Sequence, residues 1–315
     1  MASAQVPERA AELEALFRAQ RQRLWALAYR LTASVEDAED VVQEAFARLL
    51  AQPPARGRDA GPWLVRVATN LGIDALRRRR RRRYAGPWLP APLAQDESDA
   101  FGPLAGPDPE ARYGLAESAT YAFLVALEVL SPRQRAVLLL RDVLGYSARE
   151  TADALGASEG GVRVLHLRAR RALESYDAER CVPTRELQAR HRDVLERFLG
   201  CLLAQDAQGL EALLAEAVTT WTDAAGEYTA LAAPISGRAR VARFYLRAAL
   251  HRREGGVRTE IRIVNGLPAA WITLARPVRR QAPRSLLRLE LDAEGRICRV
   301  QTILAPRKLA GLGAA

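Results

Sequence analysis

The sequence has few cysteines and histidines, and it contains no long hydrophobic run. Its three cysteines (Cys181, Cys201 and Cys298) and its three histidines are widely spaced, so the sequence predicts neither a disulfide framework nor a zinc site. No apolar run reaches the ~18 residues of a transmembrane helix, and the first residues lack the basic and apolar regions of a signal peptide. These absences indicate a cytoplasmic protein without a membrane anchor, metal or cofactor.

The charge of the chain points to a polyanionic partner. Of its 315 residues, 47 are Lys or Arg and 37 are Asp or Glu, which gives a net charge of +10. Nucleic acid is therefore a better expected partner than a membrane surface. Lys308 is the single lysine. The excess of arginine fits either the codon usage of a GC-rich genome or selection for bidentate phosphate contacts.

Residues 10–83 have the periodicity of helices. After Ser34, a predicted cap, one helix has an apolar stripe made of Val41, Val42, Ala45, Phe46, Leu49 and Leu50. Its other side is mainly acidic and polar. The residues of this side are Asp37, Asp40, Gln43, Glu44 and Arg48. This face is either ordinary solvated surface or a docking face for a basic or coiled-coil partner.

A later helix, expected over residues 63–83, ends in seven consecutive arginines at positions 77–83. Such a run would contact phosphates, with a strong dependence on salt. Polar side chains recur along the helix at spacings of three to four. The candidate nucleic-acid contacts are Arg66, Asn70, Asp74, Arg77 and Arg78. Arg and Asn can read base edges, although the same residues also fit an ordinary polar surface.

Residues 84–118 are rich in Pro, Gly and acid, which predicts a linker. Residues 119–176 then return to helices with capping boxes at Ser131 and Ser147 and a turn at Gly156. This layout predicts a helix-turn-helix, with a structural helical hairpin as the alternative. The second helix has an inward stripe of Val162, Leu165, Ala169 and Leu173. Its candidate DNA contacts are Ser158, Arg163, His166, Arg168, Arg170 and Arg171.

Residues 185–312 read as helices followed mainly by strands, which favours an α+β fold with a curved antiparallel sheet. Such a fold could hold a cavity in which Asp223 acts as a general base. Candidate lining residues are Trp221, Asp223, Tyr228, Tyr245, Trp271 and Glu290. No His–Asp pair or second positioned acid is evident, so we expect a binding or structural domain here, not an enzyme.

The segments DAEDVVQEAFARLL (37–50), WLVRVATNLGIDALRRRRRRR (63–83) and LSPRQRAVLLLRDVLGYSARETADALGASEGGVRVLHLRARRAL (130–173) together carry a resemblance. In this order they resemble regions 2 and 4 of extracytoplasmic-function (ECF) bacterial sigma factors. The remainder resembles a SnoaL-like domain, and GPWLP (86–90) is similar to the WLP signature of an ECF branch with such an extension. The implied fold is multidomain, with two all-α sigma domains (10–83 and 119–176), a linker (84–118) and an α+β SnoaL-like cone (185–312).

The resemblance also implies roles. Asp37, Asp40, Gln43, Glu44 and Arg48 would dock on the clamp of the largest subunit of core RNA polymerase. The helix carrying Arg66 to Arg78 would hold melted, single-stranded DNA at the −10 element. The helix starting at Ser158 would bind double-stranded DNA at the −35 element. The acidic linker would thread the basic polymerase cleft. For the C-terminal domain, binding of a small-molecule ligand and a purely structural regulatory role are the two alternatives.

Regulation in this branch is tied to motifs in the linker and extension. The matching residues here are Trp88, Pro90, Asp223, Gly226, Pro306 and Leu309. The branch's DGGGK motif reads DAAGE at 223–227, and its NPDKL motif reads APRKL at 305–309. These departures put in question either the regulatory contact or its dependence on a ligand. Two rival hypotheses are control by a separate anti-sigma protein and a dimeric DNA-binding repressor, and the sequence has no obvious dimer seam for the second.

Overall fold

The computed structural model of the chain describes residues 2–53, 59–82, 84–94 and 112–312, with side-chain surroundings from residue 13 onward. It divides into two compact units, one made of residues 1–82, 99–118 and 126–178, and one made of residues 83–98, 119–125 and 179–315. The middle of the predicted acidic linker, residues 95–111, lies outside the described residues. Within the described ranges, no helix has both the length and the apolarity to cross a membrane.

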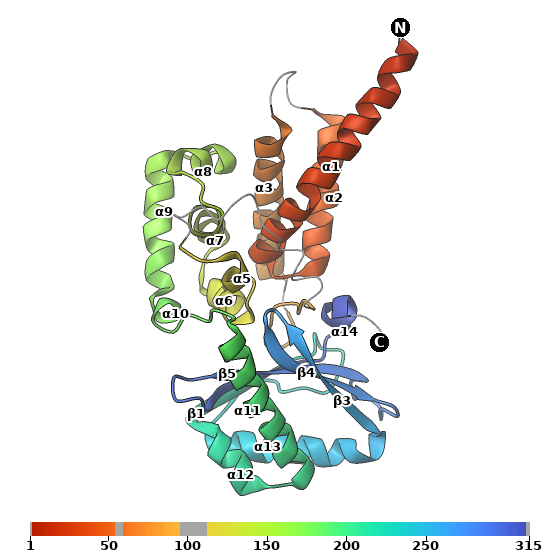
Figure 1. Ribbon diagram of the computed structural model, residues 1–315, viewed down its shortest axis with the longest axis vertical. Coiled ribbons are helices and arrows are strands. Elements are labelled where there is room, and N and C mark those ends of the chain that lie inside the picture. Colours follow the sequence, from red (N-terminus) through yellow and green to blue (C-terminus); the bar gives the residue numbers. More distant parts are fainter. Residues whose placement is uncertain (1, 54–58, 83, 95–111, 313–315) are drawn as a thin grey trace. The chain divides into compact units, whose positions relative to one another are not determined.

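The first unit begins with three helices that pack together (Figure 1), α1 (Ala2–Thr32), α2 (Val35–Ala51) and α3 (Ala60–Arg81). Ser34 caps α2, because its hydroxyl accepts a hydrogen bond from the Asp37 amide. The predicted stripe of α2 is buried except for Leu50, whose side chain is 60% exposed. The assignment of Leu50 to the core was therefore wrong. Residue 50 follows the stripe by one position, and one step turns it about 100° away from the helix's buried face.

Shorter helices complete the first unit. They are α5 (Leu115–Ser118), η2 (Leu127–Val129), α7 (Pro132–Leu138), the π-helical η3 (Leu139–Val143), α8 (Ala148–Leu155), α9 (Glu159–Ala172) and α10 (Glu174–Ala178). Both predicted capping boxes form, and Gly156 ends α8 in the left-handed conformation with φ of 58°. In α9, Val162, Ala169 and Leu173 are fully buried. The helix-turn-helix prediction is confirmed.

The second unit is an α+β domain. Its helices are α6 (Tyr121–Ala126, which ends in the first unit), α11 (Arg185–Ala204), α12 (Ala207–Leu213), α13 (Arg238–Arg252), η4 (Arg253–Gly255), α14 (Pro306–Leu309) and η5 (Ala310–Leu312). Its strands are β1 (Leu214–Asp223), β2 (Ile235–Ser236), β3 (Val257–Val264), β4 (Leu267–Leu274), β5 (Arg284–Leu291) and β6 (Ile297–Ile303), in the spatial order β2-β1-β6-β5-β4-β3.

The sheet is mixed, so the prediction of an antiparallel sheet was wrong in one pairing. β1 runs parallel to β6, with Trp221 opposite Gln301, whereas β3 to β6 form an antiparallel meander. The residue pattern of a strand marks its two faces but does not specify its neighbours. α13 and strands β3 to β5 lie between β1 and β6 in the chain. The pairing of β1 with β6 is therefore long-range, and local sequence does not encode it.

Both faces of this sheet are buried. One face packs against α11, α12 and α13 through a core that includes Phe198, Tyr245 and Ile272 (Figure 1). The other face is covered by Leu89 of the predicted linker, Tyr121 of α6, and Leu309 and Leu312 at the C-terminal end. Residues 84–94 are thus built into the second unit, because they cover apolar strand residues such as Trp271 and Leu286.

Candidate promoter-binding and regulatory sites

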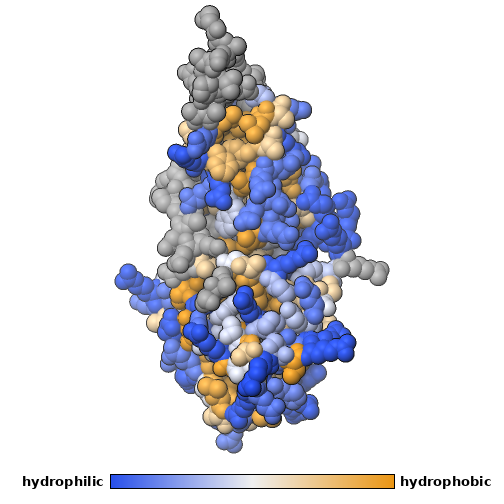
Figure 2. All heavy atoms as spheres, turned by 90° about the vertical axis from the view of Figure 1, so that its right-hand side faces the viewer, coloured by the Kyte–Doolittle hydropathy of each residue, from blue (hydrophilic) through white to orange (hydrophobic). Residues whose placement is uncertain are grey.

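The acidic face of α2 is exposed. Asp40, Gln43, Glu44 and Arg48 point away from the core, and Asp37 is half-buried. Glu44 and Arg48 form an ion pair of 2.7 Å within this face. Exposed Leu50 belongs to the same helix. In Figure 2, the side of the molecule that carries α1 and α2 shows apolar side chains gathered beside polar ones. The structure therefore presents a mixed surface on α2, with charge and one large apolar side chain.

The candidate −10 residues lie on one exposed face of α3. Arg66, Asn70, Asp74, Arg77 and Arg78 are all exposed, as their spacing requires. Asp74 pairs with Arg77 at 2.9 Å. The Asn70 amide nitrogen donates to the Arg66 carbonyl at 2.8 Å and to the Ala154 carbonyl of α8 at 3.3 Å. This face of α3 is therefore in contact with the helix-turn-helix.

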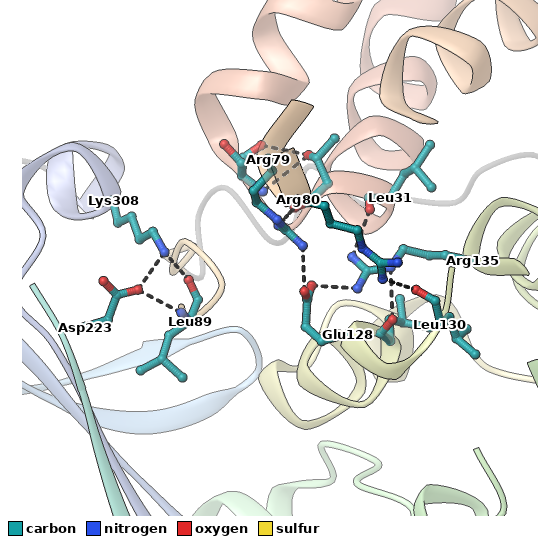
Figure 3. A network of polar contacts seen from close by, with 12 residues as sticks. Leu31, Arg79, Arg80, Leu89, Glu128, Leu130, Arg135, Asp223 and Lys308 are labelled. Atoms are coloured by element: carbon teal, nitrogen blue, oxygen red, sulfur yellow. Dashed lines mark hydrogen bonds and ion pairs between the residues drawn. The ribbon is translucent and has the colours of Figure 1, made fainter. Parts of the chain in front are cut away.

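Part of the arginine run holds the first unit together. Arg79 pairs with Glu128 at 2.6 Å and donates to the Thr32 carbonyl at 2.7 Å. Arg80 donates to the Leu130 carbonyl. In Figure 3, the side chains of Arg79 and Arg80 at the end of α3 point toward the segment that carries Glu128 and Leu130. These two arginines make protein contacts, contrary to the reading of the whole run as phosphate-binding surface. Arg83 lies outside the described residues.

Glu128 is the shared anion of this contact. Arg135, only 1% exposed, pairs with it at 2.6 Å and also donates to the Leu31 carbonyl at 2.9 Å. Burial raises the pKa of Glu128, but the charges of Arg135 and Arg79 outweigh this and hold that pKa below its usual value. Desolvation lowers the pKa of Arg135 to about 10, which leaves it charged at neutral pH.

The recognition helix α9 presents a basic and partly apolar surface. Arg163, Arg168 and Arg171 are exposed, and Val164 and Leu167 are 50% and 52% exposed beside them. Ser158 caps the helix by accepting from the Gly161 amide. His166 and Arg170 lie differently. His166 Nε2 is 2.7 Å from an Asp142 carboxylate oxygen, and Arg170 Nε is 3.8 Å from the other, so both side chains are directed toward η3.

Asp223 binds the linker. Its side chain is fully buried and accepts hydrogen bonds from the Leu89 amide (2.7 Å) and the Tyr84 hydroxyl (2.6 Å). Lys308 pairs with Asp223 at 2.7 Å and donates to the Leu89 carbonyl (Figure 3). Its ammonium also lies over the rings of Tyr84 (4.9 Å) and Trp88 (4.3 Å). We call Tyr84, Trp88, Leu89, Asp223 and Lys308 the linker latch.

Further contacts extend the latch to both ends of the linker. The Asn265 side chain accepts from the Leu93 amide (2.9 Å) and donates to the Ala119 carbonyl (2.8 Å). The Tyr121 hydroxyl donates to the Pro90 carbonyl at 2.7 Å. Gly226 has φ of +80°, and a Cβ there would lie 3.0 Å from the Ala85 methyl carbon. The chain keeps Asp223 and Gly226 of the first motif and Lys308 and Leu309 of the second, and these are the residues that contact the linker. The departures from the two motifs therefore do not remove this contact. Pro306 is exposed at the start of α14.

A cavity of about 960 Å³ lies on the helical side of the sheet. It is lined by residues of α11 and α13, of the sheet, and of segments 229–231 and 278–282. Of the six residues expected to line a cavity, Tyr245 does so, whereas Trp221, Asp223, Tyr228, Trp271 and Glu290 do not. The expectation failed because adjacent strand residues face opposite sides, and Asp223 and Trp271 face the linker. In the described part of the chain, no cluster of His, Cys, Asp or Glu could hold a metal.

Comparison with known proteins identifies the family of the chain. Residues 16–82 match the family model of Sigma-70 region 2, and residues 121–173 match that of Sigma-70, region 4. This is the class of bacterial transcription initiation factors. The ECF RNA polymerase sigma factor SigJ of Mycobacterium tuberculosis is 34% identical over 303 residues, covering 94% of this chain and 92% of SigJ. SigG of the same organism is 37% identical over 234 residues, 67% of this chain and 61% of SigG.

The fold agrees over almost the whole length. The crystal structure of M. tuberculosis SigJ matches with a TM-score of 0.71 and 29% identity, covering 94% of this chain and 98% of that one. The chain therefore belongs to the ECF RNA polymerase sigma factors, and its match to SigJ extends through the C-terminal α+β domain. As such a factor it binds core RNA polymerase, recognises −10 and −35 promoter elements and initiates transcription.

Several residues of these sites were not singled out in the sequence. Glu128 and Arg135 were missed because buried ion pairs between distant segments leave no local pattern. Lys308 was recognised only as part of a motif, although it is the single lysine of an arginine-rich chain. The presence of one lysine among so many arginines could have marked Lys308 as a functional residue. An ammonium is a compact cation, and it fits a site that a planar guanidinium does not.

Proposed function

We propose that the C-terminal domain modulates this sigma factor in cis by capturing the linker between regions 2 and 4. The observation that carries the proposal is buried Asp223, which accepts from the Leu89 amide at 2.7 Å and from Tyr84 at 2.6 Å while Lys308 neutralises its charge. A buried carboxylate without partners costs several kcal/mol, so Asp223 favours the arrangement in which the linker supplies its donors.

The capture limits how far the two sigma regions can separate. Six residues lie between Arg82 and the anchored Leu89, and the seven Cα–Cα steps from one to the other span at most about 25 Å. Tyr121, anchored to Pro90, lies at the start of region 4. A released linker of about 36 residues would extend to about 120 Å. Because the −35 and −10 elements are roughly 25 base pairs, or about 85 Å, apart, we infer that the captured linker restrains promoter engagement.

The contact between α3 and the helix-turn-helix supports the same inference. The Asn70 amide that would meet a −10 base donates to Ala154 of α8, and Arg79 and Arg80 make protein contacts. These groups cannot bind the protein and DNA at once. Engagement of the promoter would therefore require α3 to leave α8, and a linker held at both ends opposes that movement.

In vitro transcription with core RNA polymerase, on a promoter selected with this chain, tests the restraint. We compare the full chain with Lys308→Met, which removes the cation of the latch. Arg307→Met is the matched control, because Arg307 is an exposed neighbour on α14. We expect initiation by Lys308→Met to rise severalfold and Arg307→Met to match the unchanged chain. Equal activity of all three, or a loss in Lys308→Met with a normal melting temperature, would contradict the restraint.

The finer contacts with polymerase and DNA follow from the exposed surfaces. We infer that Asp40, Gln43 and Glu44 dock on the clamp of the largest polymerase subunit, with Leu50 as an apolar contact at the end of the same helix. The exposed face of α3 would hold single-stranded −10 DNA, and Arg163, Arg168 and Arg171 would contact the −35 duplex. Asp40→Arg should weaken binding to core polymerase without altering the melting temperature, whereas Glu179→Arg, an exposed acid far along the chain, should not.

We infer that the cavity binds a small molecule and does not catalyse a reaction. Its wall contains no Asp or Glu among the described residues, and Asp223, the candidate general base, is committed to the latch. A ligand that changes the latch would bias the equilibrium between captured and released linker. Recovery of an altered small molecule after incubation with the protein would contradict this reading.

A further inference from the structure

The walls of the cavity are mostly apolar. α11 contributes Leu199, Leu202 and Leu203, and the sheet contributes Ile261, Ile272 and Leu287. With a volume of about 960 Å³, the cavity lies within the range of roughly 300–1,000 Å³ that is usual for small-molecule sites. Apolar walls of this extent favour a ligand with a hydrocarbon body.

The polar part of the lining has one sign of charge. Arg247, Arg252, Arg253, Arg279 and Arg280 line the cavity together with His251, and no carboxylate is among its described lining residues. Most of these cations are exposed at the surface, so water screens them. They would attract an anion to the mouth without holding it.

Arg252 differs from the other cations. It is the last residue of α13 and is partly buried, and burial lowers the pKa of its guanidinium. None of the described carboxylates lies within ion-pair distance of it. By contrast, neighbouring Arg253 donates to the Leu203 carbonyl. A desolvated guanidinium without an anion is costly, and a bound carboxylate would remove that cost.

We propose that the cavity binds an amphipathic carboxylate, a molecule with one acidic head group and a hydrocarbon tail, with the head group on Arg252 and the tail against Leu202, Ile272 and Leu287. This deepens the proposed ligand binding and rests on it. A polyanion is disfavoured, because Arg252 is the one partly buried cation of the described lining, and the others are exposed to water. A neutral hydrocarbon would leave Arg252 without its counter-ion.

Isothermal titration calorimetry of the full chain tests the charge requirement. Dodecanoate is the probe, below its micelle concentration, and dodecanol and dodecylamine have the same tail with a neutral and a cationic head. We expect dodecanoate to bind one per chain and the other two to bind at least about tenfold more weakly. Equal binding of dodecanoate and dodecanol would overturn the proposal, as would no binding of dodecanoate.

Variants locate the head group. Arg252→Gln should lower dodecanoate affinity about tenfold or more, and Arg252→Lys should restore most of it. Arg243→Gln is the matched control, because Arg243 is an exposed arginine of the same helix that does not line the cavity. Wild-type-like binding by a folded Arg252→Gln would overturn the assignment. If Arg252→Gln does not fold, Arg252→Lys decides the matter, because loss of binding in a folded variant that keeps the positive charge would contradict the assignment.

The outcomes separate this inference from the linker restraint. Lys308→Met should still bind one dodecanoate per chain, because Lys308 is on the other face of the sheet and does not line the cavity. Dodecanoate that binds normally while Lys308→Met leaves transcription unchanged would contradict the restraint alone. A transcriptional effect of Lys308→Met without dodecanoate binding would contradict the ligand alone.

Discussion

Thr222 and Asp223 are consecutive residues at the end of β1, and they serve opposite faces of the sheet. Thr222 lines the cavity, and Asp223 accepts from the linker and pairs with Lys308. Successive strand residues must alternate in this way. A ligand that moves Thr222 therefore moves the backbone that carries the latch carboxylate. The cavity and the linker are separated by one peptide unit, which is the shortest connection by which one could sense the other.

The reactivity of Lys308 should report whether the latch is closed. As the single lysine of the chain, it is the one side-chain amine that an N-hydroxysuccinimide ester can modify. Its side chain is 13% exposed and paired, so we expect slow modification in the free protein. Asp223→Asn removes the ion pair and should accelerate modification severalfold, measured by mass spectrometry with the α-amino group as the internal reference. Equally fast modification of both proteins would show that the ion pair does not protect the amine.

The Glu128 contact should stabilise the first unit. Glu128→Gln leaves Arg79 and Arg135 without their shared anion, and we expect the free energy of unfolding to fall by about 1.5–3 kcal/mol, the value of hydrogen bonds to charged groups. Glu174→Gln, at an exposed acid of the same unit, is the control. Urea unfolding gives the free energy of unfolding of both variants. An equal decrease in the two would contradict the stabilising role assigned to Glu128.

Glu128 should also make the stability of the first unit depend on pH. Arg135 and Arg79 lower the pKa of Glu128 in the folded state below the ordinary value of 4.5. A depressed carboxyl pKa stabilises the fold above its unfolded value, and this stability is lost as pH falls through the folded pKa. Melting temperatures between pH 6 and pH 3 should therefore fall less steeply for Glu128→Gln than for the unchanged chain. Parallel curves would contradict this reading.

His191 gives the second unit a separate sensitivity to acid. Its side chain is buried, and burial, followed by the charges of Arg288 and Arg190, lowers its pKa from 6.5 to about 4. Between these values the unfolded chain binds a proton that the folded chain rejects, so protonation favours unfolding as pH falls. The cost is about 2 kcal/mol at pH 5. His191→Leu should remove it, whereas His251→Leu, at an exposed histidine, should not. Urea unfolding at pH 7 and pH 5 compares them.

Val164 and Leu167 on the recognition helix should contribute to promoter preference. Exposed apolar side chains in a major groove contact the methyl group of thymine. Val164→Ala should relax a thymine preference at one −35 position by about fivefold, or about 1 kcal/mol. Promoter selection from a randomised −35 library measures the change. Val129→Ala, at a valine that is 67% exposed outside this helix, is the control, and an unchanged selection with Val164→Ala would rule out the contact.

Local patterns predicted the elements of the fold well. Ser131, Ser147 and Gly156 marked helix ends because caps are local interactions, and they are used as expected. Val162, Ala169 and Leu173 of the predicted α9 stripe are buried for the same reason, whereas Leu165 is half-buried. The parallel pairing of β1 with β6 and the packing of residues 84–94 on the sheet depend on segments far apart in the chain. No local propensity records such pairings.

The sites were predictable to different degrees. Exposed faces follow from helical spacing, so the acidic face of α2 and the polar face of α3 lie where expected. The roles of individual cations did not follow, because one arginine of a run looks like the next. Arg79 and Arg80 bind protein, and Arg252 is a partly buried arginine in an apolar wall. Only the tertiary surroundings separate these from the exposed arginines.

The chain enters the second unit three times, and this order has a consequence for a protein that is still being made. Leu89 and Tyr121 leave the ribosome well before the strands that cover them. At roughly 5–20 residues per second, the remaining 190 or so residues take about 10–40 s to synthesise. In the later part of that interval, after region 4 ends at residue 173, regions 2 and 4 are complete while Lys308 of the latch does not yet exist. If the latch restrains the factor as proposed, each nascent chain passes through an unrestrained stage before Lys308 is made.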